Sequence, residues 1–551
     1  MQRSGRSYRN HGRFRPQILF YCGPTALLKA LRQDWNRRAS NPNSHCSLHI
    51  LRIAWHNSSM GYSELYFGHA DAKTEAIREP ESFVKSFVDH GNIVNAVVEE
   101  GRFLVLGPKG TGKSALGWYL QRTARERDLV VQTRDVSDLP ISEVNQLKTG
   151  EEPGMSRSLN AWKFILLCAL LDVILEDEGS ELNKNPEANA VIGKLREYGF
   201  LDPTPKNAIL RASKTTWKVP IPKIGEIYSK ESSESIHLVH LIPYLQKWVI
   251  GEWGNRNKHF LILDGLDSIY LNDKRYIPSI STLVQSALFI NQEIQQHGVG
   301  GGVVILIRND VYSRLDLPDG GKIRADWAVE LDWRILSGDA KDAPLFDLID
   351  TKAVSLINAQ PFDVVAKHFP REIDLGSGVK TVEVFNYLLN LTRHTPRDLL
   401  RLLEHIRSVE ATFSEASRSD SIRLNVIREG VLQYATKYFV DAIRNELVGR
   451  GGSGDEARAV VDALRNLGAR KFDRATFAAS LAITAEGIAE VPSADEALRW
   501  LFFAGAIGNE VGGGVARYLQ FFHRRDDNDV YMGGTLVIHN ALVYAWALPW
   551  N

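Results

Sequence analysis

A single eight-residue segment, Gly107 to Ser114, constrains the fold of this chain more than any other feature. It reads Gly-Pro-Lys-Gly-Thr-Gly-Lys-Ser, follows the apolar stretch Phe103–Leu106 and precedes the helical pattern Ala115–Leu120. The spacing G-x-x-x-x-G-K-[ST] between a strand and a helix is that of a phosphate-binding P-loop. Its glycines let consecutive backbone N–H groups face phosphate oxygens, and the positive end of the following helix faces the same anion. The segment therefore predicts an α/β fold with a parallel sheet that leads into this loop.

Each part of this loop has an expected task in nucleotide binding. Lys113 would bridge the β- and γ-phosphates of ATP as a point charge, and the Ser114 hydroxyl would coordinate Mg²⁺. ATP and Mg²⁺ are therefore the expected cofactors. We place Lys113 on a solvent-facing loop. The rest of the phosphate cradle would be Gly107, Pro108, Lys109, Gly110, Thr111 and Gly112.

A second apolar stretch, His259–Leu263, ends at the carboxylate of Asp264 and continues as Gly265-Leu-Asp267. A buried parallel strand that ends beside the P-loop aims its last side chain at the phosphates, so Asp264 would reach Mg²⁺ through water. Any buried strand followed by an Asp-Gly turn gives the same pattern. Because a P-loop precedes this one, we favour the metal role.

Two strand patterns follow. Gly302–Ile307 is a third apolar stretch, and it leads into Arg308, Asn309 and Asp310. A polar side chain such as Asn309 at this position could orient the attacking water. Ala328–Trp333 is a plausible fourth strand.

A helix pattern begins at Thr395-Pro-Arg397-Asp398, with Thr395 as the N-cap, Pro396 at the first position and Asp398 as a capping-box-like acceptor. Its apolar face runs from Leu399 to Ile406. An arginine in the first turn is disfavoured by the positive helix end, so Arg397 suggests an anionic partner. A surface arginine on an ordinary helix is the alternative.

The order of these segments resembles the ASCE division of P-loop NTPases, near the AAA+ and STAND ATPases. Asp264-Gly-Leu-Asp267 is similar to the acidic motif of STAND and NACHT modules, Asn309 falls at the sensor-1 position, and His394–Asp398 resembles the sensor-2 helix of STAND and KAP-type ATPases. Phe67–Glu75 with the P-loop segment also looks like a family of bacterial P-loop ATPases known mainly by that name. The resemblance covers about residues 60–551 and implies an ATP-dependent switch in bacterial defence or signalling.

The acidic motif departs from these families. AAA+ enzymes place Glu directly after the metal-binding Asp, where this chain has Gly265, and STAND motifs often follow the second Asp with an acid, where this chain has Ser268. Asp267 is then the default general base, and slow hydrolysis is the expected consequence. Arg314 and Arg324 are candidates for an arginine finger supplied by a neighbouring subunit.

The length of 551 residues predicts several domains, on a prior of about 150 residues each. Two glycine clusters, Gly298–Gly302 and Gly449–Gly454, are expected to be flexible joints. We expect a disordered or upstream extension over 1–59, a P-loop core over 60–345 with an insertion near 180–235, a helical lid over 346–450 and a winged-helix-like domain over 451–551.

The last of these regions decides between two kinds of partner. Three helices with a terminal hairpin form a winged helix, which DNA readers share with protein-docking modules. Residues 431–551 carry 12 Lys/Arg against 14 Asp/Glu, so they lack the basic excess that phosphate contact demands. Arg524-Arg525 at the expected hairpin tip is the basic spot, opposed by nearby aspartates. The expected helices are 456–467, 473–482 and 495–507, and the expected hairpin strands are 517–523 and 535–539.

Three functions stay open at this point: a nucleotide-dependent conformational or assembly switch, a DNA-handling loader or initiator ATPase, and an ATP-binding module with little hydrolysis. We favour the switch, with a protein partner or self-association, and disfavour nucleic acid. No membrane span is expected, because the most apolar stretch, Phe164–Leu175, is 12 residues long and suits a buried helix. Three cysteines are too few for a disulfide framework, which favours a reducing, cytoplasmic environment.

A composition break at Met60 generates the first prediction. Residues 1–59 contain ten Lys/Arg and the single acid Asp34, whereas the remainder carries 56 bases and 65 acids. A protein that begins at Met60 should melt within a few degrees of the full chain and keep its ATP turnover, measured by thermal melting and phosphate release. A large loss of stability or solubility would show that the removed segment packs on the rest.

Overall fold

The computed structural model describes most of the unit Met60–Asn551, and the details below concern these residues alone. Residues 1–59, including Cys22 and Cys46, lie outside the described part. So do Asp267, Ser268 and Arg525, as well as much of the expected insertion. The described ranges are 60–139, 155–201, 241–251, 257–266, 276–334, 338–357, 359–375, 381–413, 421–450, 452–488, 491–512, 518–524 and 529–550.

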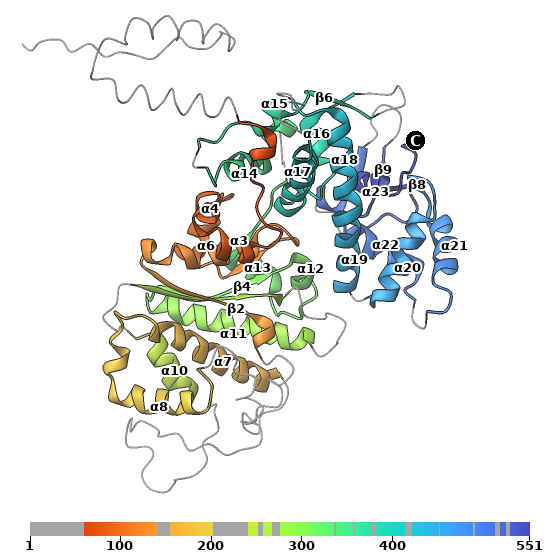
Figure 1. Cartoon of the computed structure of the whole chain (residues 1–551). Helices are drawn as coiled ribbons and strands as arrows, with labels where there is room; N and C mark the ends of the chain where they lie inside the picture. The colour runs from red at the N-terminus through yellow and green to blue at the C-terminus, as the bar shows by residue number, and fades with distance from the viewer. Residues whose placement is uncertain are drawn as a thin grey trace, which may run out of the picture. The chain divides into compact units, whose positions relative to one another are not determined.

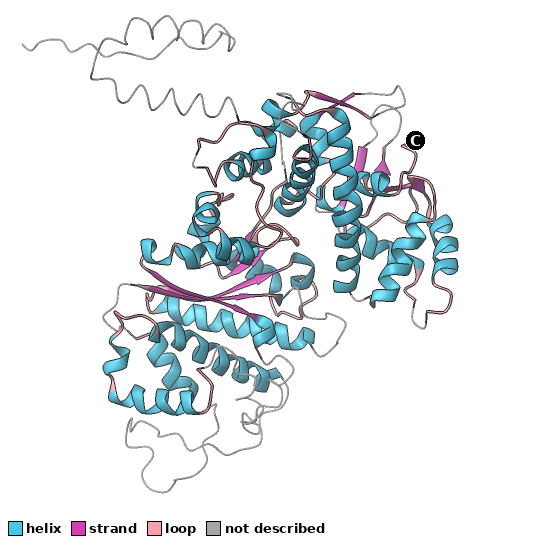
Figure 2. Ribbon diagram, viewed as in Figure 1, coloured by secondary structure: helices cyan, strands magenta, loops and turns pink. Residues whose placement is uncertain are grey.

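A five-stranded, all-parallel sheet with the order β2-β3-β4-β1-β5 confirms the predicted α/β fold (Figure 2). Four of its five strands coincide with the stretches predicted above, and the fifth, Leu129–Asp135, contains the stretch Val130–Asp135, whose sequence also fits a strand. Such stretches form strands here because helices cover both faces of the sheet, so alternate residues need not be polar. The strands are β1 (Leu104–Leu106), β2 (Leu129–Asp135), β3 (Lys258–Asp264), β4 (Gly301–Ile307) and β5 (Ala328–Glu330).

Two apolar clusters bury the two faces of this sheet. On one face, α5 (Ile93–Val98) and the P-loop helix α6 (Lys113–Arg122) pack on the strands. On the other face lie α7 (Met155–Leu175), α10 (Ile242–Val249) and α11 (Tyr276–Gln296) (Figure 1). The sheet is therefore the middle layer of a three-layer sandwich.

Helix α7 is the most apolar helix of the described chain. By length and composition, Ser158–Leu175 is sufficient to cross a membrane, yet 67% of that window is buried inside the protein. Its side chains Trp162, Leu166 and Leu170 are almost fully buried in the cluster shared with α10 and α11. The prediction of a buried helix in this stretch is confirmed.

A helical region follows the sheet and includes a small antiparallel ribbon, β6 (Glu372–Asp374) with β7 (Thr381–Glu383). The start of the described chain packs with this region: Met60, Tyr62 and Phe67 belong to its apolar cluster, and the Tyr62 hydroxyl donates to Leu403 O at 3.0 Å. The helices are α14 (Pro344–Ala353), α15 (Val364–His368), α16 (Val384–Leu389), α17 (Pro396–Glu410), α18 (Leu424–Tyr434), the π-helical turn η10 (Ala435–Phe439) and α19 (Val440–Gly449).

The C-terminal region combines helices with a four-stranded antiparallel sheet of order β10-β9-β11-β8. The expected direct pairing of 517–523 with 535–539 is wrong, because β9 lies between those two strands. The helix expected over 495–507 ends at Phe503, and Gly505, at φ 79°, begins the turn into β9. The elements are α20 (Gly454–Arg465), β8 (Lys471–Phe472), α21 (Arg474–Thr484), α22 (Ala494–Phe503), β9 (Ile507–Val511), β10 (Tyr518–Phe521), β11 (Leu536–Ile538) and α23 (Asn540–Ala545).

The glycine cluster 298–302 is a packed turn between α11 and β4, so the expectation of a flexible joint there is wrong. A Cβ on Gly301 would lie 2.1 Å from the carbonyl oxygen of His259, and a Cβ on Gly302 would lie 2.1 Å from Asn291 Oδ1. The Asn291 amide in turn hydrogen-bonds both backbone groups of Val303 at 2.9 Å. These glycines are required for close approach of the chain.

Candidate nucleotide site

The P-loop connects β1 to α6 at the carboxyl edge of the sheet. Gly110 and Gly112 take φ values of 85° and 101°, which glycine adopts without strain. The Thr111 hydroxyl donates to Pro108 O at 2.9 Å, and the Trp333 indole N–H donates to Thr111 O at 2.9 Å. The loop is thus held from within and from the segment after β5.

Lys113 is the first residue of α6 and is only 5% exposed, so its expected place on a solvent-facing loop is wrong. Its ammonium donates to Gly107 O at 2.9 Å and Pro108 O at 3.0 Å. The ammonium can bend back because it lies on the concave side of the loop. Phosphate oxygens bound in that concavity would offer it charged acceptors in place of neutral carbonyls.

A cavity adjoins this loop, and we call it the P-loop cavity. It lies between the P-loop, the N-terminal segment 69–93 and the start of α17. One side is formed by the P-loop, whereas the N-terminal side carries mainly apolar and aromatic side chains. The residues that line the cavity include His69, Phe87, His90, Ile93, Lys113, Ser114, Trp333, Arg397 and Leu400.

The N-terminal wall of this cavity was not assigned a role from the sequence. The one sequence feature in this wall was Phe67–Glu75, which contributed to a family resemblance but did not indicate a chemical role for any residue. The wall is anchored by a buried ion pair, Lys352 Nζ to Glu75 Oε1 at 2.7 Å, and by Arg401, whose Nη2 donates to Gly68 O at 2.5 Å. The His90 and Trp333 rings stack with centroids 5.0 Å apart. Residues distant in the sequence therefore fix this wall.

The first turn of α17 touches the P-loop directly. The Arg397 amide N–H donates to Gly110 O at 3.2 Å, and a Cβ on Gly110 would lie 3.0 Å from the Cβ of Arg397. The Thr395 hydroxyl accepts from the Asp398 amide at 3.3 Å, which confirms the predicted N-cap. The apolar face Leu399–Ile406 is buried as expected. Arg397 therefore lies where its side chain can reach a nucleotide bound in the P-loop cavity.

Asp398 differs from its expected capping-box role. Its carboxylate does not turn back to the N-cap amide but accepts from Arg393, through the guanidinium at 2.8 and 2.9 Å and the amide at 3.1 Å. The Tyr438 hydroxyl adds a fourth bond at 2.8 Å. Burial alone would raise the pKa of Asp398, but Arg393 and these hydrogen bonds hold it below its ordinary value. Asp398 thus ties the start of α17 to η10.

Asp264 is the last residue of β3, as predicted, and its Oδ1 accepts from the Gly265 amide at 2.8 Å. Together with the Ser114 hydroxyl, it is the expected set of protein oxygens for Mg²⁺. No group of three His, Cys, Asp or Glu side chains within the described ranges is arranged as a metal site. A cation here would therefore take its other ligands from water and phosphate.

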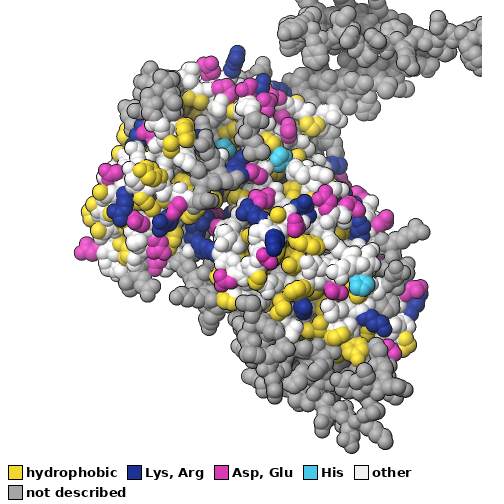
Figure 3. Space-filling model, turned by 180° about the vertical axis from the view of Figure 1, so that it is seen from behind, with side chains coloured by type: hydrophobic (Ala, Val, Ile, Leu, Met, Phe, Trp, Pro, Cys, Tyr) yellow, Lys and Arg dark blue, Asp and Glu magenta, His cyan; other side chains and the backbone are white. Residues whose placement is uncertain are grey.

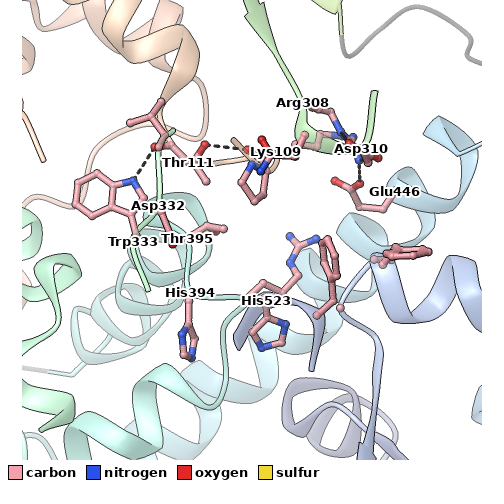
Figure 4. Close-up of a pocket in the computed structure, with 18 of the residues that line it drawn as sticks. Lys109, Thr111, Arg308, Asp310, Asp332, Trp333, His394, Thr395, Glu446 and His523 are labelled. Carbon is pink, nitrogen blue, oxygen red and sulfur yellow. Dashed lines mark hydrogen bonds and ion pairs between the residues drawn. The ribbon is translucent and has the colours of Figure 1, made fainter. Parts of the chain in front are cut away.

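Asn309 begins the short helix α12 (Asn309–Tyr312) directly after β4. Its Oδ1 is buried and has no hydrogen-bond partner among the described residues. Asn309 lines a second cavity, which we call the Asn309 cavity, together with Pro108, Lys109 and Thr111 of the P-loop. Figure 4 labels Lys109 and Thr111 at this cavity. A buried acceptor without a partner is costly, so this atom is suited to a water or a ligand group.

A buried cluster of four charges lies beside Asn309. Arg308 holds Asp310 with two bonds of 2.8 and 2.9 Å and reaches Glu446 of α19 at 2.6 Å. Arg450 contacts the same Asp310 at 2.9 Å. Figure 4 shows Arg308, Asp310 and Glu446 together on one side of the Asn309 cavity. The end of β4 is thereby joined to the end of α19.

The contacts of Asp310, Arg314 and Arg324 affect their expected roles as a general base or as arginine fingers. Burial alone would raise the pKa of Asp310, but Arg450 and Arg308 hold it well below its ordinary value. Because both carboxylate oxygens are already engaged, Asp310 is poorly suited to accept a proton from water. Arg314 and Arg324 are exposed, and Arg324 pairs with Glu330 at 2.7 Å.

Buried histidines and rings lie across the Asn309 cavity, where His394 comes from the segment before α17 and Phe503, Phe522 and His523 come from the C-terminal region. Burial, with nearby Arg524, lowers the pKa of His394 and of His539 to about 3, and burial also lowers the pKa of His523. Arg524 was expected at an exposed hairpin tip, and this is wrong. It lies part-buried in the turn η12 (Phe522–Arg524), where its Nη2 donates to Asn390 Oδ1 at 2.5 Å and its guanidinium lies 5.2 Å from the Phe521 ring.

Comparisons with known proteins add little to this geometry. No protein-family model matches the chain, and a search of curated proteins finds no match. Among solved structures, the crystal structure of Cdc6p from Pyrobaculum aerophilum is similar, with 14% sequence identity and a TM-score of 0.27. The match covers 81% of this chain and 90% of that chain. A TM-score this low carries no inference about this chain.

The buried cluster generates a prediction about stability. Asp310→Asn removes one of two carboxylates that balance Arg308 and Arg450, and breaking a buried pair costs about 3–5 kcal/mol. We expect a lower melting temperature at pH 7, with the exposed Asp316→Asn as a near-neutral control. The pKa of Asp310 is lower in the folded than in the unfolded state, so its stabilisation is complete above the unfolded pKa and is lost on acidification. The difference in melting temperature between wild type and Asp310→Asn should therefore become smaller below about pH 5. A difference that does not change with pH would contradict the ion pairing of Asp310.

Proposed function

We propose that this protein is a P-loop ATPase that binds ATP with Mg²⁺, hydrolyses it slowly and uses the nucleotide as a conformational or assembly switch. The observation that carries the proposal is the P-loop cavity. A phosphate-binding loop forms one wall, an apolar and aromatic wall fits a nucleotide base, and the first turn of α17 hydrogen-bonds the loop itself. The strand β4 between β1 and β3 is consistent with the ASCE resemblance of the sequence motifs.

Different residues of the site would bind the phosphates, the metal and the attacking water. The P-loop amides and Lys113 would hold the β- and γ-phosphates, and Ser114 with Asp264, the latter through water, would hold Mg²⁺. The bound cation neutralises charge on the terminal phosphates during transfer. Arg397 would contact the γ-phosphate from the opposite wall. Asn309, whose buried Oδ1 has no partner among the described residues, would orient water on the side of the Asn309 cavity.

A switch role is supported by the contacts that connect Asn309 and Arg397 to helices outside the sheet. Arg308 and Asp310 flank Asn309 in the sequence and are ion-paired to α19, while Arg397 begins α17. Loss of the γ-phosphate would therefore change forces on two helices of the region 346–450. Such nucleotide-driven rearrangements of a neighbouring element are a common switching device. A protein partner or a second copy would read the change, in defence or signalling by analogy with the STAND resemblance.

The same observations weigh against a DNA-handling loader. A winged-helix-like C-terminal domain would need basic side chains free for phosphate, yet Arg524 is occupied by Asn390. On the face in Figure 3, basic and acidic side chains are interspersed and do not gather in a basic stripe. We therefore assign the C-terminal region to protein docking or intramolecular clamping.

The P-loop assignment predicts the behaviour of Lys113→Ala. ATP binding or its hydrolysis should be lost, because the charge that bridges the phosphates is removed. Nucleotide affinity is measured by equilibrium binding with Mg²⁺, and folding by circular dichroism. Since Lys113 is buried, the isosteric Lys113→Met serves as a second variant that keeps the apolar stem. Lys184→Ala, at an exposed lysine of a surface ion pair, is the matched control. Wild-type affinity and turnover in folded Lys113 variants would reject the assignment.

The switch role predicts a different result for Arg397→Ala. This variant should still bind ADP but lose the difference in shape or assembly between the ADP and ATP states, since only ATP offers the terminal charge that Arg397 would pair with. Small-angle scattering and sedimentation in the two nucleotide states measure the difference. Arg407→Ala, on the same helix but paired with Glu404 away from the P-loop, should retain it. An ATP-specific change that survives in Arg397→Ala would contradict the sensing role.

A further inference from the structure

A carboxylate that the sequence did not single out lies next to the expected metal-binding acid. Asp135 is the last residue of β2, and Asp264 is the last residue of β3. The two strands are parallel and directly paired, with Asp135 in register with Asp264. Neighbouring strands lie about 4.8 Å apart, so the two residues end side by side at the carboxyl edge of the sheet.

Both residues belong to the face of the sheet that carries the P-loop helix. In β2, Val131 packs in the apolar cluster of α6, and Thr133 approaches Gly117 of that helix. In β3, Phe260 and Ile262 belong to the same cluster. Since strand side chains alternate between faces, Asp135 and Asp264 share this face. Arg134, one residue before, points to the other face and pairs with Asp172 of α7 at 2.6 Å.

Gly265 makes room for the Asp135 carboxylate. A Cβ on Gly265 would lie 2.7 and 2.8 Å from the two carboxylate oxygens of Asp135, closer than any side chain permits. Gly265 also takes φ 86°, a conformation that other residues adopt only with strain. The Asp135 carboxylate therefore lies directly against the backbone of Gly265, the residue that follows Asp264 and that AAA+ enzymes replace by Glu.

Two other acids near the P-loop already have an assigned or observed partner. Asp264 is assigned to Mg²⁺, and Asp310 is held by two guanidiniums. Asp135 is exposed, and its Oδ1 accepts one hydrogen bond, from the Ser137 amide at 2.7 Å. A carboxylate has further acceptor sites beyond this bond, so Asp135 can also receive a water O–H.

We propose that Asp135 is the catalytic carboxylate that orients the attacking water in ATP hydrolysis, in place of the default candidate Asp267. This inference rests on the proposed ATPase function. The water oxygen forms a bond to the γ-phosphorus, the bond from that phosphorus to the β,γ-bridging oxygen breaks, and ADP leaves with the electron pair. The water proton passes to the carboxylate of Asp135, and ADP and phosphate are the products.

Asp135→Asn separates this chemistry from the structural role of the residue. The amide oxygen of Asn can still accept the Ser137 N–H that caps the short turn η3 (Val136–Asp138), but an amide is not a proton acceptor at neutral pH. Turnover should fall by about 100-fold or more, the usual contribution of a general base. Equilibrium ATP affinity with Mg²⁺ and the melting temperature should stay at the wild-type values. Asp135→Glu, which keeps the carboxylate, should retain more turnover than Asp135→Asn.

Asp138→Asn, at an exposed carboxylate of the same turn, is the matched control and should turn over ATP normally. Asp267→Asn is measured in parallel. If Asp135→Asn turns over ATP like wild type while Asp267→Asn does not, Asp135 has no such role, but the ATPase function stands. A wild-type protein that binds ATP without any turnover also overturns the role of Asp135. Failure of wild type to bind ATP, or Lys113 variants that bind it normally, would instead overturn the proposed function itself.

Discussion

All five strands of the sheet run in one direction, so their carboxyl ends meet at a common edge. This edge lies beside the P-loop, the Asp135–Asp264 pair and the start of α12, although these segments come from distant parts of the chain. Loops at the carboxyl edge of an open parallel sheet are where such folds bind ligands. The cavities, the ion-pair cluster and the candidate chemistry all depend on that alignment.

Buried charges join this edge to the rest of the chain. Lys352 holds Glu75 behind the wall of the P-loop cavity, Arg393 holds Asp398 at the start of α17, and Arg308 with Arg450 holds Asp310 and Glu446. Removing charges from water is expensive, so such contacts persist only where each charge is matched. In the proposed switch, a nucleotide that alters one partner would act on a remote helix through these contacts.

Local patterns predicted much of this architecture. The strands of the parallel sheet, the buried helix α7 and the N-cap of α17 follow from apolar runs and capping residues that act over a few positions. The strand β9 was missed because the expected helix was carried to residue 507, past Gly505, where the chain turns. Pairing with β10 and β11 decides the conformation of Ile507–Val511. Arg524 was misplaced for a similar reason. A charged side chain in a turn is normally solvated, whereas contacts with Asn390 and the Phe521 ring partly bury this one.

The sequence by itself determined a glycine-rich loop between a strand and a helix and predicted that it is a P-loop, because glycine, lysine and serine at this fixed spacing are typical of one. It also predicted that Asp264 ends a buried strand and that Asn309 follows one closely. Only the tertiary structure decided which strands are neighbours, and this brought Asp135 beside Gly265 and segment 69–93 against the P-loop. The physical reason is range: backbone conformation and capping depend on adjacent residues, whereas strand order and the matching of buried charges depend on contacts between segments far apart in the chain.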